Sequence, residues 1–189
     1  DVDLLSFSAH KMYGPKGIGA LYLRGGAYSF PIEPILFGGG QEKGLRSGTL
    51  NVPAIVGFGE ASRLCTEQLM AEQKRISALR DAFEELICHH VPSVRVNGAR
   101  ANRLPNTSSL TFPGIDADAL LLNVPNLMLA TGSACAARAI EPSHVLQAIG
   151  VSRTDAHSTI RVSIGRYTTE DEIEIAANEL AAAYIRLRH

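Results

Sequence analysis

The sequence contains little cysteine, and its three cysteines, Cys65, Cys88 and Cys135, are far apart. Because no C-x-x-C pair occurs, we expect no zinc site and no other metal site. An odd number of widely spaced thiols does not suit a disulfide framework either. It favours a reducing, cytoplasmic setting.

The sequence also lacks an excess of charge and a long apolar run. Its 18 basic and 19 acidic residues nearly balance, whereas binding to nucleic acid or a membrane surface would require clustered Lys and Arg. No apolar run approaches the roughly 20 residues of a membrane-spanning helix, and no signal peptide is visible. We therefore expect neither nucleic acid nor a membrane as a partner. The start at Asp1, without Met and directly before an apolar run, leads us to expect a fragment or a processed product.

The sequence does contain enough apolar residues, 46% of the chain, to form the core of one large or two small domains. Apolar runs at residues 2–5 and 18–23 predict two strands joined by a loop and a turn. From residue 52 to residue 90, apolar side chains recur at steps of three and four, which predicts one long helix or two in series. Pro92 ends this pattern.

The remainder of the chain alternates short strands and helices, which predicts a small α+β domain. Strands are expected at residues 94–96, 108–112, 127–130 and 158–164. One helix is expected at residues 116–122, capped by Asp116, and another at residues 144–149. A last helix begins at the capping box formed by Thr169 and Glu172.

The loop after the first strand is the first candidate site, because it contains Ser8, His10 and Lys11 within four residues. A partly desolvated lysine can form an imine with a carbonyl group. Serine and histidine side chains beside it can hold a phosphate, and together these groups are what a pyridoxal phosphate site requires. The alternative is a surface loop with an ordinary solvated lysine.

A glycine-rich segment at residues 38–49 is the second candidate site. Its backbone N–H groups can approach an anion closely, and Arg46, Ser47 and Thr49 can bind a phosphate or a carboxylate. The segment is not a P-loop, because Leu45 stands where that motif requires Lys. The alternative is a flexible surface loop.

Two further residues have side chains suited to chemistry. Cys135 lies among Gly, Ser and Ala, which suits a cysteine on a mobile loop, and Arg138 could favour its thiolate; the alternative is a small residue in a tight turn. Arg161 lies in an otherwise apolar strand and needs a partner. That partner is either a substrate carboxylate, held by two hydrogen bonds, or a structural salt bridge. Cys65 and Cys88 lie on or beside the helical apolar stripe and are expected to fill the core.

Four stretches of the sequence resemble the motifs of one family. They are Ser-Phe-Ser-Ala-His-Lys at 6–11 with Tyr-Gly-Pro-Lys-Gly at 13–17, Gly-Gly-Gly-Gln-Glu at 38–42 with Arg-Ser-Gly-Thr at 46–49, Gly-Ser-Ala-Cys at 132–135 with Glu-Pro-Ser-His-Val-Leu at 141–146, and Ile-Arg-Val-Ser at 160–163 with Gly-Arg at 165–166. Together they make the chain similar, over nearly its whole length, to the C-terminal half of a NifS/IscS-like cysteine desulfurase of the class V aminotransferase family.

The resemblance implies an α/β fold that is the C-terminal part of a pyridoxal-phosphate-dependent transferase of fold type I. Residues 1–62 would be the end of the cofactor-binding large domain, with a remnant of its sheet. Residues 63–189 would be a small α+β domain that carries the loop of the catalytic Cys135.

The resemblance also implies how the cofactor would be held. Lys11 would bind pyridoxal 5′-phosphate covalently and remove the α-proton of the substrate L-cysteine. Ser8 and His10 would hold the phosphate of the cofactor. Thr49 would reach the phosphate bound by the neighbouring subunit, which implies a homodimer.

On the substrate side, the resemblance implies that Arg161 binds the carboxylate of L-cysteine. Cys135 would accept the sulfur as a persulfide, leave L-alanine, and pass the sulfur to an acceptor protein such as an iron–sulfur cluster scaffold. A second chain or segment would supply the N-terminal half, so this chain alone is expected to be inactive. The alternatives are a selenocysteine lyase-like enzyme and a non-catalytic half-protein that dimerises or docks sulfur acceptors.

Overall fold

The computed structural model describes residues 1–131 and 143–188. The chain divides into two compact units, Asp1–Leu69 and Met70–His189, which we call unit 1 and unit 2. The division lies inside the long helix α1 (Val52–His90). The expected domain boundary between residues 62 and 63 falls in the same helix and stays a prediction.

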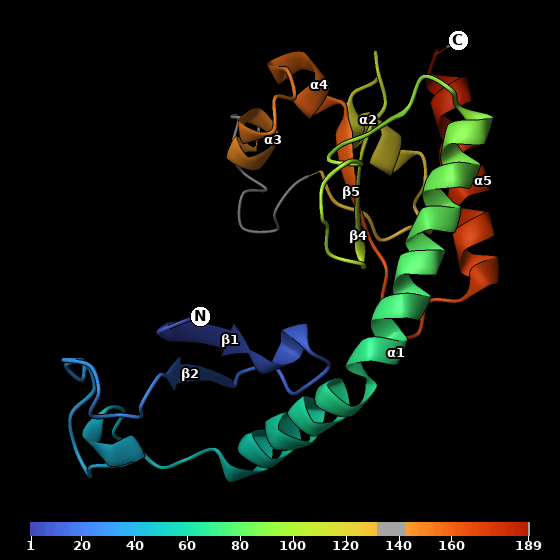
Figure 1. The fold of residues 1–189 in the computed structure, drawn as a ribbon. Coiled ribbons are helices and arrows are strands. Elements are labelled where there is room, and N and C mark those ends of the chain that lie inside the picture. Colours follow the sequence, from blue (N-terminus) through green and yellow to red (C-terminus); the bar gives the residue numbers. More distant parts are fainter. Residues whose placement is uncertain (132–142, 189) are drawn as a thin grey trace. The chain divides into compact units, whose positions relative to one another are not determined.

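Unit 1 begins with an antiparallel hairpin of β1 (Leu4–Ser8) and β2 (Gly19–Leu23). The 3₁₀ helix η1 (Ala9–Lys11) follows β1 directly, and a second 3₁₀ helix, η2 (Glu42–Gly44), lies in the glycine-rich segment. Figure 1 shows the hairpin in blue. The predicted order of strand, loop and strand is confirmed.

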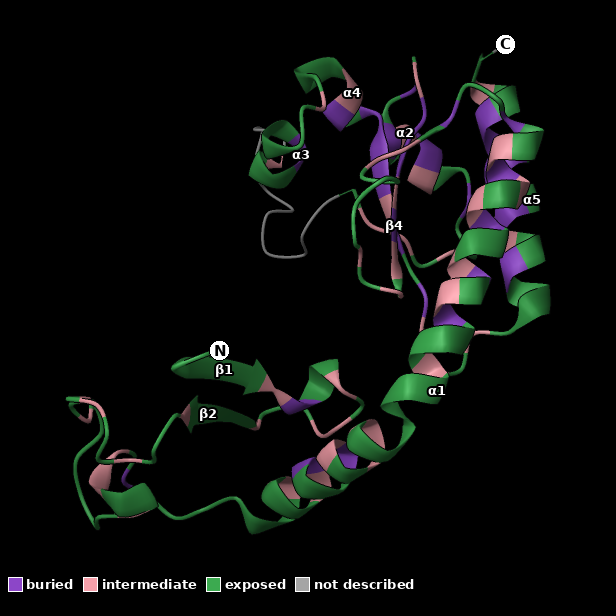
Figure 2. Cartoon of the chain, in the orientation of Figure 1, coloured by how far each residue is buried: buried purple, intermediate pink, exposed green. Residues whose placement is uncertain are grey.

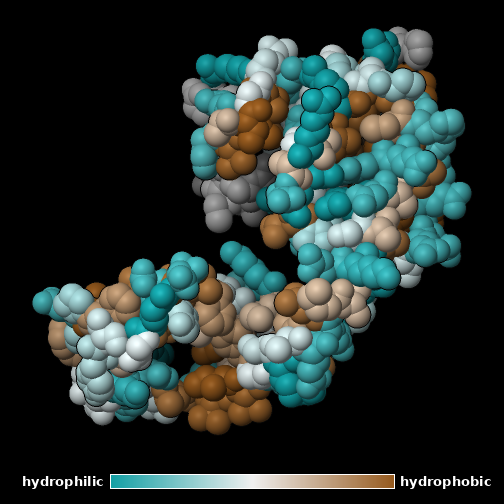
Figure 3. Space-filling view, in the orientation of Figure 1, coloured by the Kyte–Doolittle hydropathy of each residue, from teal (hydrophilic) through white to brown (hydrophobic). Residues whose placement is uncertain are grey.

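The hairpin of unit 1 is exposed on both of its faces in this chain. Successive side chains of a strand point to opposite faces, yet Leu4, Leu5, Leu21 and Tyr22 are each about half exposed. Figure 2 shows most of both strands in green, and Figure 3 shows brown, apolar side chains on the surface of unit 1. An isolated two-stranded hairpin is only marginally stable in water. The order of unit 1 therefore depends on contacts between the hairpin and the first part of α1.

Helix α1 is one continuous helix of 39 residues rather than two in series. Asn51 caps its start, because its Oδ1 accepts a hydrogen bond from the Ala54 N–H at 3.3 Å. The helix ends at His90, shortly before Pro92, as the sequence predicts. In the described part of the chain, neither α1 nor any other helix combines the length and the apolar character that crossing a membrane requires.

Unit 2 is built on an antiparallel sheet with the strand order β3 (Arg95–Val96), β4 (Thr107–Thr111) and β5 (Thr159–Ser163). The later part of α1, the short helix α2 (Ala117–Leu122) and the C-terminal helix α5 (Glu170–Arg188) contribute apolar side chains to its core. This arrangement confirms the expected mixture of helices and strands. The largest fully buried apolar side chains are those of Phe83, Ile87, Leu110, Phe112, Leu120, Val124, Ile160 and Leu180.

Two predicted helix starts are confirmed by their hydrogen bonds. The Asp116 Oδ1 accepts from the N–H groups of Asp118 and Ala119, at 3.0 and 3.1 Å. At α5, the Thr169 Oγ1 accepts from the Glu172 N–H at 3.3 Å, and the Glu172 Oε2 accepts from the Thr169 N–H at 2.9 Å. These caps satisfy N–H groups that have no partner within the helix.

The strand expected at residues 127–130 is wrong. Only Ala130 forms a bridge, and its partner is Arg161. The chain before it turns instead, because the Leu127 N–H donates to the Val124 carbonyl at 3.0 Å while both side chains pack in or against the core of unit 2.

Two short helices follow residue 142. Helix α3 (His144–Ala148) agrees with the expected helix at residues 144–149. Helix α4 (Arg153–His157) has no counterpart among the expected elements. A signal for it exists in the sequence, because the Ser152 Oγ caps the helix by accepting from the Asp155 N–H at 3.1 Å.

Replacing Leu110 with Ala is expected to lower the free energy of unfolding of unit 2 by about 2–5 kcal/mol, because the change leaves a cavity at a fully buried position. Leu122→Ala is the matched control. It removes the same atoms from a side chain that is 81% exposed, so its effect is expected to stay within about 0.5 kcal/mol. Denaturant unfolding followed by circular dichroism measures both values, and equal losses would contradict this description of the core.

Candidate functional site

The turn that carries Lys11 is held by one buried residue. Ala9 is fully buried, and its carbonyl oxygen accepts hydrogen bonds from the N–H groups of Met12 and Gly14, both at 2.9 Å. The Ala9 N–H donates to the Ile18 carbonyl at 3.1 Å, which ties the turn to the chain before β2. Lys11 itself is exposed. The turn therefore fixes the backbone of Lys11 and leaves its side chain accessible.

Three polar side chains follow one another in this turn. Ser8 is half-buried, whereas His10 and Lys11 are exposed. Within residues 1–131 and 143–188, no hydrogen bond or ion pair engages the Ser8 hydroxyl, the His10 ring or the Lys11 amine. An amine, an imidazole and a hydroxyl so placed can bind a ligand that has both a carbonyl carbon and a phosphate. In their donor chemistry these residues fit pyridoxal phosphate.

The glycine-rich segment is held together by its own side chains. The Gln41 Oε1 accepts a hydrogen bond from the Gly48 N–H at 2.9 Å, and the Ser47 Oγ accepts one from the Gly40 N–H at 3.4 Å. Gly40 has a φ of 74°, a left-handed conformation that glycine adopts at little steric cost. The shape of the segment is thus set by residues within it.

Thr49 differs from Arg46 and Ser47 because its side chain makes no hydrogen bond within this segment. Ser47 is buried, and the Arg46 guanidinium donates to the carbonyls of Gly48 and Thr49, at 3.0 and 3.4 Å. The Ser47 hydroxyl and one nitrogen of Arg46 are therefore used inside the segment, while the exposed Arg46 guanidinium keeps further N–H donors. The Thr49 hydroxyl is exposed and, among the described residues, has no hydrogen-bond partner.

Arg161 lies in β5 with backbone on both sides. It pairs with Ser109 of β4, and on the other side its N–H donates to the Ala130 carbonyl at 2.6 Å. Its Nε is buried and has no hydrogen-bond partner among the described residues. Leaving a buried guanidinium N–H unpaired is costly. Within residues 1–131 and 143–188 no ion pair to Arg161 occurs, and its guanidinium has the donor groups that a carboxylate would accept from.

Two residues of α1 that the sequence patterns did not single out, Glu72 and Arg75, hold the chain after β5. Glu72 of α1 accepts hydrogen bonds from the Arg166 Nε and Nη2, the latter at 2.9 Å. Arg75, about one turn further along α1, donates to the carbonyls of Arg166 and Thr168, the latter at 2.8 Å. The hydrogen bonds from Arg166 hold the pKa of the Glu72 carboxyl below its ordinary value of 4.5. These contacts fix the segment that directly follows the strand of Arg161.

The nucleophile expected at Cys135, with its neighbour Arg138, lies outside the described residues. The other two cysteines are half-buried. Cys88 packs against the core of unit 2, and burial raises the pKa of its thiol. Cys65 lies in unit 1, where its Sγ is 3.7 Å from the Met12 carbonyl oxygen. Cys88 thus packs against the core as the sequence predicts, whereas Cys65 is half-buried and is not among the described residues that form or flank the core.

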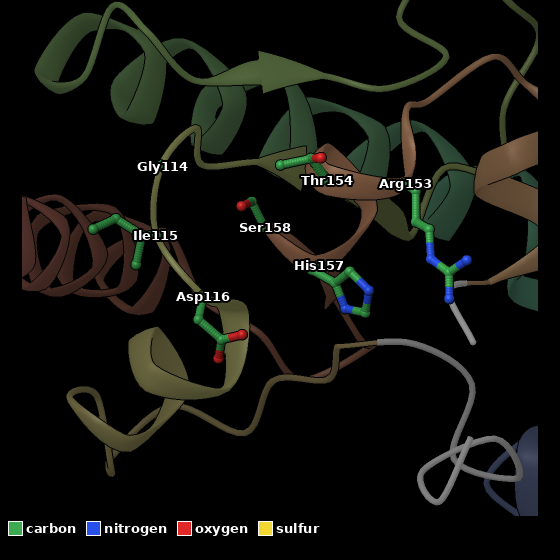
Figure 4. Close-up of a pocket in the computed structure, with 7 residues that line it drawn as sticks. All are labelled: Gly114, Ile115, Asp116, Arg153, Thr154, His157 and Ser158. Atoms are coloured by element: carbon green, nitrogen blue, oxygen red, sulfur yellow. The ribbon is translucent and has the colours of Figure 1, made fainter. Parts of the chain in front are cut away.

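A hollow of about 480 Å³ in unit 2 is lined by residues at the start of α2 and along α4. Figure 4 shows Asp116, Arg153 and His157 among these residues. The Asp116 carboxylate already caps α2, and none of the described residues around the hollow is a candidate for cofactor or substrate binding. The hollow is therefore separate from the candidate site residues.

Replacing Glu72 with Gln is expected to destabilise unit 2 at neutral pH. The difference in stability between variant and parent is expected to disappear at low pH. The Glu72 carboxylate contributes stability above its ordinary pKa of 4.5 and loses that contribution as the pH falls through its lowered folded-state pKa. Unfolding midpoints of the parent and the variant, measured from neutral pH to about pH 2, check this dependence.

Glu67→Gln is the control for that experiment. Glu67 lies on the same helix and pairs with Arg63, but both side chains are exposed. Its replacement is expected to change the midpoint little. A loss in Glu72→Gln that stays constant across the pH range would contradict the role given to the Glu72–Arg166 ion pair.

Comparison with known proteins gives one family. A model of the aminotransferase class-V family matches residues 1–175. The chain is 44% identical over 187 residues to the cysteine desulfurase IscS of Stutzerimonas stutzeri strain A1501, and 42% identical over 188 residues to that of Rickettsia typhi strain Wilmington. These alignments cover 99% and 100% of this chain but 46% of each relative. The chain thus spans about half the length of the curated relatives it matches.

Solved structures give the same result for the fold. A NifS-like protein, 34% identical, superposes with a TM-score of 0.84 over 99% of this chain and 47% of its own. The NifS-like protein from Rickettsia africae ESF-5, also 34% identical, has a TM-score of 0.83 over 97% of this chain and 48% of its own. The α/β fold expected from the sequence is confirmed.

Proposed function

Since the chain belongs to the aminotransferase class-V family, we propose that it forms the C-terminal half of a pyridoxal-phosphate-dependent cysteine desulfurase. Such an enzyme removes the sulfur of L-cysteine and releases L-alanine. The similarity to proteins named cysteine desulfurase, over 99% of this chain, supports the reaction class. The observation that carries the proposal is the turn of Ser8, His10 and Lys11, whose polar groups have no partners among the described residues.

Residues of unit 1 would hold the cofactor. When bound, pyridoxal phosphate supplies a conjugated ring that stabilises negative charge at the substrate α-carbon. Lys11 would bind the cofactor through its amine, and Ser8 and His10 would donate hydrogen bonds to its phosphate. The Lys11 amine, when free, would take the proton from the substrate α-carbon.

Thr49 would reach the phosphate held by a second copy of the chain, so the proposal includes a homodimer. Its exposed hydroxyl, on a segment held in shape by Gln41 and Arg46, supports this role. Each site would then contain residues from both copies, which would make dimerisation a condition of activity.

The substrate would be held and desulfurated by two residues of unit 2. The buried Nε–H of Arg161 lacks a partner among the described residues, and a guanidinium can donate two hydrogen bonds to one carboxylate. Arg161 would therefore hold the carboxylate of L-cysteine. The thiolate of Cys135 would attack the substrate sulfur and form an S–S bond, while the C–S bond of L-cysteine breaks with its electron pair left on carbon, which a proton then converts to L-alanine. Cys135 would thus keep the sulfur as a persulfide. An acceptor protein, such as an iron–sulfur cluster scaffold, would then take the sulfur from Cys135.

The remaining part of such a site would come from a segment or a second chain that carries the N-terminal half. The chain spans about half the length of the relatives it matches, which supports this part of the proposal. The exposed faces of β1 and β2 support it as well, because strands with free edges and apolar faces need a covering partner.

Mixing the purified chain with pyridoxal phosphate is expected to give a visible absorption band that Lys11→Ala abolishes, because the Lys11 amine is the group that binds the cofactor. Lys16→Ala is the matched control, since Lys16 is an exposed lysine between β1 and β2, and it is expected to retain the band. Added L-cysteine is expected to shift the band. A band that persists in Lys11→Ala would contradict the role of Lys11. A band that forms only with the N-terminal half present would support both Lys11 and the need for that half.

Incubation with L-cysteine, in the presence of the N-terminal half, is expected to place a persulfide on Cys135. Cys65 and Cys88 are internal controls, because both are half-buried and burial raises the pKa of the Cys88 thiol. Peptide mass spectrometry after alkylation locates the added sulfur. Cys135→Ser is expected to abolish the persulfide while retaining the cysteine-induced shift of the absorption band. Persulfide found mainly on Cys65 would contradict the assignment.

A further inference from the structure

We infer that the first turns of α1 form a packing surface for the turn at residues 9–15, which we call the Lys11 turn. We call this surface, formed by Gly57, Phe58, Ala61 and Cys65, the seat. Gly57 and Ala61 are the residues of the seat that position Lys11. This inference rests on the proposed function, because that function gives Lys11 its importance. Neither residue carries a reactive group. Each acts by allowing or limiting how closely the backbone of the turn approaches the helix.

The seat contacts the chain on both sides of Lys11. Before it, the ring of Phe7 lies edge-on to that of Phe58 of α1, with centroids 5.7 Å apart. Just after it, the Met12 carbonyl oxygen lies 3.7 Å from the Sγ of Cys65. Lys11 therefore sits in a short segment that is held to α1 at both ends.

Just after the Met12 contact, at Gly14 and Pro15, the approach to α1 leaves no room for one extra methyl group. A Cβ added at Gly57 would lie 2.7 Å from the Cγ of Pro15 and 3.3 Å from its Cδ. A Cβ added at Gly14 would lie 3.0 Å from the Cβ of Ala9 and 3.2 Å from that of Ala61. Separations this short lie below ordinary van der Waals contact, so an added group at Gly57 would require Pro15 to shift away from the helix, and one at Gly14 would require Ala9 or Ala61 to shift.

The four seat residues Gly57, Phe58, Ala61 and Cys65 share one face of α1. Gly57, Ala61 and Cys65 follow one another at steps of four, which places them one above the other. A glycine inside a helix costs about 1 kcal/mol relative to alanine. At Gly57 the glycine lies where the turn packs against the helix, since an added Cβ would be 2.7 Å from the Cγ of Pro15. Gly59, two positions further on, has no atom within 4 Å of an added Cβ.

Displacement of the turn would reach Lys11 through Ala9. Ala9 is fully buried, and its carbonyl oxygen accepts hydrogen bonds from the N–H groups of both Met12 and Gly14. A shift at Pro15 or Gly14 must either break these hydrogen bonds or carry Ala9 with it. In both cases the backbone of Lys11, two residues after Ala9, changes its position.

The test compares Gly57→Ala with Gly59→Ala in the full chain, using two measurements. Amide hydrogen exchange of Met12 and Gly14 reports the turn without any cofactor. Borohydride trapping of pyridoxal phosphate, followed by peptide mass spectrometry, gives the ratio of labelling at Lys11 to labelling at Lys16. This ratio reports the position of the Lys11 amine rather than overall folding.

Gly57→Ala is expected to speed exchange of both amides and to lower the Lys11-to-Lys16 ratio by about tenfold, because sub-ångström misplacement of a reacting group is costly. Gly59→Ala is expected to change neither measurement. The double variant Gly57→Ala with Pro15→Ala removes the Cγ that the new methyl meets, and it is expected to restore both.

Unchanged amide hydrogen exchange of Met12 and Gly14 in Gly57→Ala would contradict the inference that the seat holds the turn. Changed exchange with an unchanged labelling ratio would overturn its positioning role, since the contacts would then matter for structure alone. Equal labelling of Lys11 and Lys16 in the parent chain would count against the proposed cofactor lysine instead. In that case the exchange rates and their rescue by Pro15→Ala would still decide the seat.

Discussion

The close approach of the Lys11 turn to helix α1 is the constraint on which unit 1 depends. The hairpin of β1 and β2 leaves apolar side chains exposed on both faces, so it gains little from burial of its own. Ala9 and Ala61 are among the few buried apolar residues of unit 1, and they meet where Gly14 has no side chain. A few contacts with α1 thus hold the turn that carries Lys11.

Unit 2 differs from unit 1 because it is stabilised by a large apolar core. A strand held by neighbouring backbone and by the contacts after its end can keep a polar group buried without a partner. Arg161 is in that position, with its Nε unpaired among the described residues. The ion pair of Glu72 and Arg166 holds the next segment of chain. Unit 2 therefore contains a buried guanidinium N–H without a partner among the described residues, whereas unit 1 carries an exposed lysine amine that follows a half-buried serine and an exposed histidine in the chain.

The parts of the fold that could be predicted from the sequence are those governed by neighbouring residues. The step of three and four gave helix α1, and Asp116 and Thr169 marked two helix starts. The strand expected at residues 127–130 failed because Val124 and Leu127 turn toward the core, which their local pattern does not reveal. Helix α4 is short, and its cap at Ser152 is a local signal that could have been used.

For the candidate site residues, too, the sequence and the tertiary structure each supply a different part of the description. Motifs in the sequence named Lys11, Thr49 and Arg161 as candidates, because the chemistry of an amine, a hydroxyl or a guanidinium is carried by the residue itself, and their roles stay predictions. Only the tertiary structure decided that Arg46 and Ser47 are used within their own segment.

By itself, then, the sequence determined the family and most of the helical and extended segments, whereas its choice of reactive residues stays a prediction. The tertiary structure decided which of those residues have internal partners and which glycine is needed for close packing. Gly57 and Gly59 are the same residue on the same helix, yet only Gly57 faces Pro15. Such a difference depends on contacts between segments far apart in the chain, and local sequence rules describe neighbours within about one helical turn.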